Sequence, residues 1–115
     1  MENWYICDIM GYAKERGKLE KVLAKIIWIK VYDEKNLAII LDSHEQFSHT
    51  IRILKNKEPE IFTDLYNTEL QEVKDGRKLF KESEGEETRL TNFLAYKDII
   101  VKALEKTIKV SNETV

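Results

Sequence analysis

The order of apolar patterns along the chain constrains its fold more than any other feature of the sequence. The stretch Trp4–Ile9 is rich in aromatic and branched residues, which predicts a strand. From about Tyr12 or Lys18 to Ile26, apolar residues recur at the spacing of one helix face: Leu19, Val22, Leu23 and Ile26. Alternation returns in Ile27–Asp33, and the apolar run "LAIILD" follows the polar turn "DEKN". Two strands joined by a short turn predict a β-hairpin.

Helical patterns dominate the second half. Ser43 has Gln46 three residues later, a capping-box pattern that predicts a helix burying Phe47, Ile51 and Leu54. Pro59 suits the first position of a short helix that carries Ile61, Phe62 and Leu65. "DGRKLFKE" (residues 75–82) predicts a turn and a fourth strand, although Leu70, Val73 and Phe80 would also suit a helix. A long helix is expected from residue 88 or 90 to about residue 110, followed by a frayed tail over residues 111–115.

The resulting order is strand, helix, strand, strand, helix, strand. It predicts an α+β fold, a ferredoxin-like βαββαβ antiparallel sheet with two helices on one face and a long C-terminal helix. With 115 residues, the chain has the size of a single domain, which we place at residues 1–110.

Over about Trp4–Glu82 the chain resembles an RNA recognition motif (RRM). In "WYICDI", Tyr5 stands at the stacking position of the family's first-strand signature. "KNLAII" is similar to the third-strand signature in Lys35, Ala38 and Ile40, but it has Leu37 and Ile39 where the family has aromatic rings. Bases stack on such rings, so the resemblance implies an RRM-like sheet that binds single-stranded RNA only weakly.

Strand alternation would place apolar side chains on the outer face of this sheet, namely Tyr5, Cys7, Leu37, Ile39 and Leu41. An exposed apolar patch of that kind needs a cover. We expect the C-terminal helix to cover it, and a partner protein or a second copy of the chain, as in a homodimer, is the alternative. Tyr5, Leu37, Ile39 and Leu41 are therefore the candidate protein-binding or helix-covered residues.

The net charge of −2 gives no overall attraction to nucleic acid, so a phosphate-binding face would have to be local. The candidate RNA-binding residues are Tyr5 with the bases Lys14, Arg16, Lys18, Lys21, Lys25 and Lys35. Because Glu15 and Glu20 interleave with these bases, the same pattern also fits an ordinary solvated helix face.

The first quarter of the chain has a second resemblance. "YICDIMGYAKERGKLEKVLAKI" is similar to the first strand and helix of the small ferredoxin-like protein of the CRISPR adaptation complex. That resemblance implies a metal-dependent nuclease with Asp8 as a ligand across a homodimer axis. Aspartates at strand ends more commonly cap a turn.

Other signs of catalysis are scarce. His44 and His49 lie five residues apart, whereas ligand pairs on a helix face are usually four apart, so we expect no metal site. The sequence contains no Gly-rich phosphate loop and no nucleophile motif. We therefore expect no enzymatic activity and no cofactor.

These features predict a non-enzymatic, RRM-like binding module that acts mainly through protein contacts, with an RNA-containing assembly as one setting. The abundance of Ile, Lys and Glu suits an AT-rich or thermophilic source, such as a small archaeal virus. An inhibitor that docks on a host defence complex is thus an alternative. The single cysteine and the lack of an apolar run near the roughly 18 residues of a membrane span favour a cytoplasmic protein without membrane contact.

Overall fold

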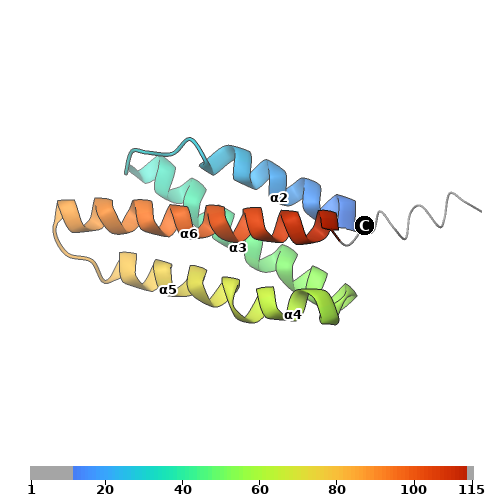
Figure 1. Ribbon diagram of the computed structural model, residues 1–115. Helices are drawn as coiled ribbons and strands as arrows, with labels where there is room; N and C mark the ends of the chain where they lie inside the picture. The colour runs from blue at the N-terminus through green and yellow to red at the C-terminus, as the bar shows by residue number, and fades with distance from the viewer. Residues whose placement is uncertain (1–11, 114–115) are drawn as a thin grey trace, which may run out of the picture.

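The computed structural model describes residues 12–113, and the regular structure in this range is helical throughout (Figure 1). In chain order the helices are α2 (Ala13–Ile26), α3 (Glu34–Lys57), α4 (Pro59–Asn67), α5 (Glu69–Lys81) and α6 (Glu86–Glu113). The predicted α+β, RRM-like fold is wrong, because residues 12–113 contain no strand from which a sheet could form. The same finding contradicts the ferredoxin-like fold implied by the resemblance to the CRISPR protein. The first predicted strand, Trp4–Ile9, lies outside the described residues.

The helices form an up-and-down bundle. Helices α2 and α3 run in opposite directions, α4 and α5 return one after the other, and α6 runs back along both pairs (Figure 1). Only Thr68 separates α4 from α5, so these two helices together occupy the place of one helix in the bundle. Helix α6 contacts each of the other described helices, and its closest neighbours among them are α5 and α2.

The predicted first helix is confirmed as α2. Its apolar stripe is buried as expected, at Leu19, Val22 and Ile26. Because this stripe recurs every three or four residues, one face of α2 packs against both α3 and α6. Just before the helix, the ring of Tyr12 meets the ring of Phe62 edge-on, with 5.4 Å between centroids, and this contact joins the start of α2 to α4.

The predicted strand "KNLAIILD" is instead the first third of α3. Asp33 caps this helix by accepting a hydrogen bond from the backbone N–H of Asn36 at 2.7 Å. The helix therefore begins at Glu34, nine residues before the predicted start at Ser43. Ser43 is not a cap: it is buried inside the helix, and its hydroxyl donates to the carbonyl of Ile39 at 2.8 Å.

Segment Ile27–Asp33, predicted as a strand of a hairpin, connects α2 to α3 without pairing to any described residue as a strand. The side chain of Ile29 is buried, while Trp28 and Val31 face solvent. The amide of Asn36 donates to the carbonyl of Val31 at 2.8 Å and closes the connection onto the start of α3. The alternating pattern that predicted a strand thus reflects a single buried side chain, Ile29, in a loop whose neighbouring residues Trp28 and Val31 are exposed.

The short helix predicted at Pro59 is confirmed as α4, with Phe62 and Leu65 buried and Ile61 partly buried. The predicted fourth strand is wrong, because residues 75–81 belong to α5 and only Glu82 follows the helix. Gly76 lies where α5 meets α6: a Cβ atom there would be 3.0 Å from Cδ1 of Ile99. The glycine read as part of a turn therefore permits close contact between two helices.

The predicted long C-terminal helix is present as α6, but residues 12–113 contain no sheet for it to cover. It begins at Glu86 and continues to Glu113, so residues 111–113 of the expected tail are helical and Ser111 is fully buried. Its buried stripe includes Phe93, Tyr96 and Ile100. Within residues 12–113, none of the helices combines the length and the apolar character needed to cross a membrane.

Candidate functional site

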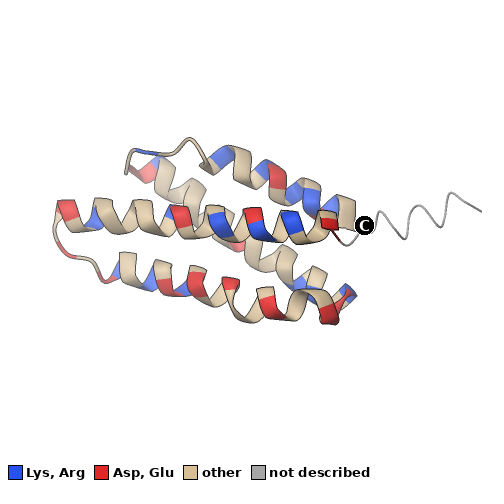
Figure 2. Ribbon diagram, in the orientation of Figure 1, with Lys and Arg blue, Asp and Glu red and all other residues tan. Residues whose placement is uncertain are grey.

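The basic residues predicted to bind phosphate lie along α2 (Figure 2), except Lys35, which is on α3. Lys18, Lys21 and Lys25 come together beside Asp42 and Gln46 of α3 and line a small depression of about 190 Å³ there. The remaining candidates on these two helices do not line it: Lys14, Arg16 and Lys35. Lys14 is at the start of α2, the Nη1 atom of Arg16 is enclosed without a hydrogen-bond partner among the described residues, and Lys35 is exposed at the start of α3.

The apolar residues predicted for the outer sheet face lie on a helix. Leu37, Ile39 and Leu41 are partly buried on α3 and pack at the margin of the core, whereas Ile40 is fully buried. Leu37 and Leu41 are four residues apart and share one side of the helix, whereas Ile39 points to the opposite side, so the three cannot form one flat face. Tyr5 and Asp8 lie outside the described residues.

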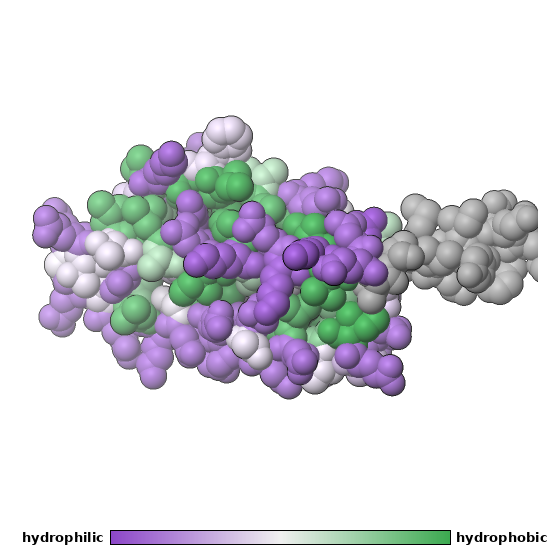
Figure 3. Space-filling model, viewed as in Figure 1, coloured by the Kyte–Doolittle hydropathy of each residue, from purple (hydrophilic) through white to green (hydrophobic). Residues whose placement is uncertain are grey.

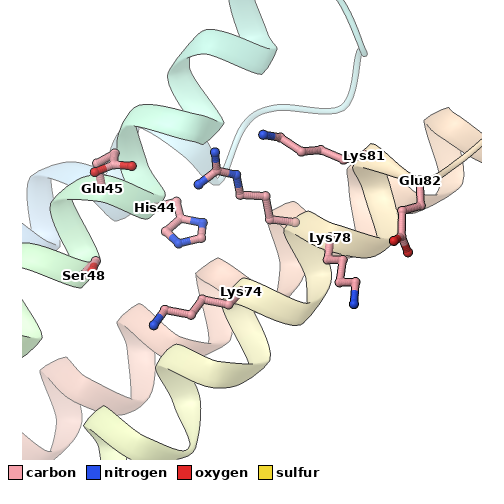
Figure 4. Close-up of a pocket in the computed structure, with 8 residues that line it drawn as sticks. His44, Glu45, Ser48, Lys74, Lys78, Lys81 and Glu82 are labelled. Atoms are coloured by element: carbon pink, nitrogen blue, oxygen red, sulfur yellow. The ribbon is translucent and has the colours of Figure 1, made fainter.

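A groove between α3 and α5 gathers more basic side chains than the depression beside α2. It has a volume of about 570 Å³ and is lined by His44, Glu45, Ser48, Lys74, Arg77, Lys78, Lys81 and Glu82. Figure 4 shows Lys74 and Lys81 extending from α5 toward α3 on either side of His44, while Lys78 and Glu82 point away. The bases of α5 lie at positions i, i+3, i+4 and i+7, a spacing that puts them on one side of a helix.

His44 forms the inner wall of this groove and is 5% exposed. Its Nδ1 atom lies 2.6 Å from the hydroxyl oxygen of Tyr96, a fully buried residue of α6. Burial lowers the pKa of His44, and the nearby charges of Arg77 and Lys74 lower it further, against the opposing effect of Glu45. Burial also raises the pKa of Tyr96 well above its ordinary value. Both side chains are therefore neutral at neutral pH.

These protonation states fix the direction of the hydrogen bond. A buried hydroxyl proton without an acceptor is costly, and Nδ1 of His44 is the acceptor within reach of Tyr96. The tyrosine hydroxyl thus donates to Nδ1, and the proton of the neutral imidazole resides on Nε2. The sequence offered no sign of this pair, because its two members are 52 residues apart.

A second surface feature is at the end of the bundle where the loop between α2 and α3 approaches the start of α6. We call it the apolar end, and it consists of Ile27, Trp28, Val31 and Leu90, which are exposed by 44%, 78%, 61% and 40%. Hydrophobic side chains are visible on the surface at this end of the molecule (Figure 3). Beside them is a hollow of about 630 Å³ between the loop and α6.

Two residues that line the hollow, Tyr32 and Arg89, are held in place by hydrogen bonds and ring contacts. The guanidinium of Arg89 donates to the hydroxyl of Tyr32 at 2.9 Å and to the carbonyl of Ser83 at 3.2 Å. The ring of Tyr32 in turn packs against Phe93 and Phe80 of the core, with centroids 4.9 and 5.5 Å away. The loop that carries Trp28 is therefore held to α6 and α5 by specific contacts.

Within residues 12–113, no three His, Cys, Asp or Glu side chains lie close enough together to hold a metal ion. The two histidines do not form a pair: His44 is hydrogen-bonded to Tyr96, whereas His49 is exposed on α3.

Comparison of the sequence with protein-family models gives no match, and comparisons with curated proteins and with solved structures give none that is significant.

Proposed function

We propose that this protein is a non-enzymatic binding module that acts through protein contacts, and that the apolar end is the surface it uses. The observation that carries the proposal is the 78% exposure of Trp28 on a braced loop, next to exposed Ile27 and Val31. Contiguous exposed apolar side chains mark interaction surfaces, and tryptophan is enriched among the residues that dominate binding energy.

The surroundings of Trp28 define the chemistry of the partner. The hollow is walled by Val31 and Leu90, which suit an apolar anchor side chain. Lys30 and Arg89 line the same hollow and Glu86 opposes them, so the lining carries a net positive charge. The occupant that fits best is a protein segment with an apolar anchor flanked by acidic residues.

Selection from a displayed library of random peptides tests this proposal with the full chain as the target. Enriched peptides should combine apolar and acidic residues, and Trp28→Ala should weaken their binding by at least about 2 kcal/mol, or roughly 30-fold in Kd. Leu79→Ala is the matched control, since Leu79 is 56% exposed on α5 and does not line the hollow. Peptides that bind Trp28→Ala as tightly as the parent would contradict the proposal.

Analytical sedimentation of the chain alone tests whether the apolar end binds a second copy of the chain. Reversible dimerisation that Trp28→Ala abolishes would make a second copy of the chain the partner of the apolar end, whereas a monomer at all concentrations leaves the peptide result to stand by itself.

A further inference from the structure

The groove between α3 and α5 has no part in the proposed function, and its lining is specific in chemistry. Its lining contains four bases of α5, Lys74, Arg77, Lys78 and Lys81, of which Lys78 points away (Figure 4), and Glu45 is the acid on the opposite helix. The whole chain has a net charge of −2, so this concentration of positive charge is local. Like charges held close together repel one another, and an anion between them removes that repulsion.

The groove also presents neutral donors. With Nδ1 occupied by Tyr96, the Nε2–H of His44 is a hydrogen-bond donor in the wall of the groove, and the hydroxyl of Ser48 lies in the same lining. Arg77 adds a planar fork of N–H donors, which matches two oxygens of one phosphate. A ligand that satisfies this set must carry several acceptor oxygens and negative charge, as a phosphate group does.

The size of the groove favours a compact ligand over an extended one. A volume of about 570 Å³ falls within the range of small-molecule sites. Lys74 and Lys81 are seven residues apart, so the basic stretch is about 10 Å long along α5. Glu45 and Glu82 also line the groove and would repel a polyanion that extends past the bases.

We propose that the groove between α3 and α5 binds a compact, phosphate-bearing anion, held by Lys74, Arg77 and Lys81 with His44 and Ser48 as hydrogen-bond donors. The ligand is a free polyphosphate or a small organic diphosphate such as a nucleoside diphosphate. Binding raises the affinity of His44 for a proton, because the anion opposes the positive field of Arg77 and Lys74 that faces this ring from α5. The other groups facing the ring are Glu45 on α3 and Tyr96 on α6.

Proton NMR of the imidazole ring with inorganic pyrophosphate tests the proposal in the full chain at physiological salt. His49→Gln removes the other histidine signal, so the signal that remains is that of His44. We expect pyrophosphate to shift this signal saturably and to move its titration to higher pH by about one unit. A signal unchanged by millimolar pyrophosphate overturns the proposal.

Two charge-removing variants locate the site. Arg77→Gln and Lys74→Gln should each weaken pyrophosphate binding about tenfold or more, and Lys74 is exposed, so its variant tests the site even if Arg77→Gln alters the fold. Lys18→Gln removes the same charge from α2 and should change the affinity less than twofold. Equal losses in all three variants would show a general charge effect and overturn the proposal.

The source of the phosphate is distinguished by a nucleoside diphosphate and by a single-stranded RNA dodecamer in the same titration. Nucleoside diphosphate binding tighter than pyrophosphate identifies an organic ligand, and weaker binding identifies a free polyphosphate. RNA that shifts the His44 signal at a concentration more than tenfold below that of pyrophosphate overturns the compact-ligand proposal in favour of an extended nucleic acid.

Discussion

Replacing Tyr96 with Phe removes one oxygen atom from the centre of the bundle and tests the buried pair on which the groove wall depends. The ring and its packing against Phe80 remain, so no cavity of consequence forms. What is lost is the 2.6 Å hydrogen bond to Nδ1 of His44, and the imidazole nitrogen then lacks a donor in a nearly closed environment. Leaving a buried polar atom unsatisfied costs about 1–3 kcal/mol. We expect the free energy of unfolding to fall by that amount.

Urea unfolding followed by circular dichroism at neutral pH measures the change, and thermal melting should show a decrease in Tm of about 4 °C per kcal/mol for a chain of this length. Tyr66→Phe is the control, because Tyr66 is partly exposed beside Arg52. Loss of its hydroxyl group should change the free energy of unfolding by less than about 0.5 kcal/mol.

A double-mutant cycle isolates the pair. In a His44→Leu background, Tyr96→Phe should be less destabilising than in the parent, since the acceptor is already gone. If Tyr96→Phe is as stable as the parent in both backgrounds, the hydrogen bond contributes nothing and the assignment of the imidazole proton to Nε2 fails with it.

Three further predictions concern pH, capping and the register of α3. Because the folded state holds the pKa of His44 below its ordinary value, the unfolded chain takes up the proton first. The free energy of unfolding should therefore decrease as pH falls below about 6.5, by no more than about 1.4 kcal/mol per pH unit. Urea unfolding at a series of pH values measures this dependence, and His44→Gln should abolish the contribution of His44 to it. Asp33→Ala removes the cap on Asn36 and should lower the free energy of unfolding by about 1 kcal/mol, with Asp33→Asn close to the parent. Ile40→Ala should cost about 2–5 kcal/mol and Ile39→Ala clearly less, since only Ile40 is fully buried; the reverse order in denaturant unfolding would contradict the helical register.

Sequence patterns located α2 and α4, whose buried sides are mainly apolar. The stripes of α2 and α4 contain Leu, Val, Ile and Phe at helical spacing, and both helices were located correctly. The buried side of α3 passes through Ser43, His44 and Thr50, polar residues that interrupt the apolar period. Ser43 meets its hydrogen-bonding need within its own helix, so it can be buried without a partner elsewhere. Ser43 was therefore interpreted as the cap of a helix that in fact begins at Glu34.

Local composition indicated the wrong secondary structure at two other places. Consecutive apolar residues in "LAIIL" give no polar contrast from which strand and helix can be distinguished. The Asp75–Gly76 pair has the composition of a turn, but Gly76 serves the approach of α6, which a reading of neighbouring residues cannot reveal. The groove was missed for the same reason: the spacing of Lys74, Arg77, Lys78 and Lys81 signals a basic helix face only once the segment is known to be helical.

The place of α6 in the bundle has a consequence for synthesis of the chain. Each of the other described helices contacts α6, yet the ribosome adds α6 after all of them. Until its 28 residues have emerged, α5 lacks its main neighbour and α2 lacks one of its two, so parts of their apolar stripes remain open to water or to other chains. Nascent chains that stop before residue 86 should therefore be substrates for chaperones and proteases, whereas release of α6 completes the core in one step.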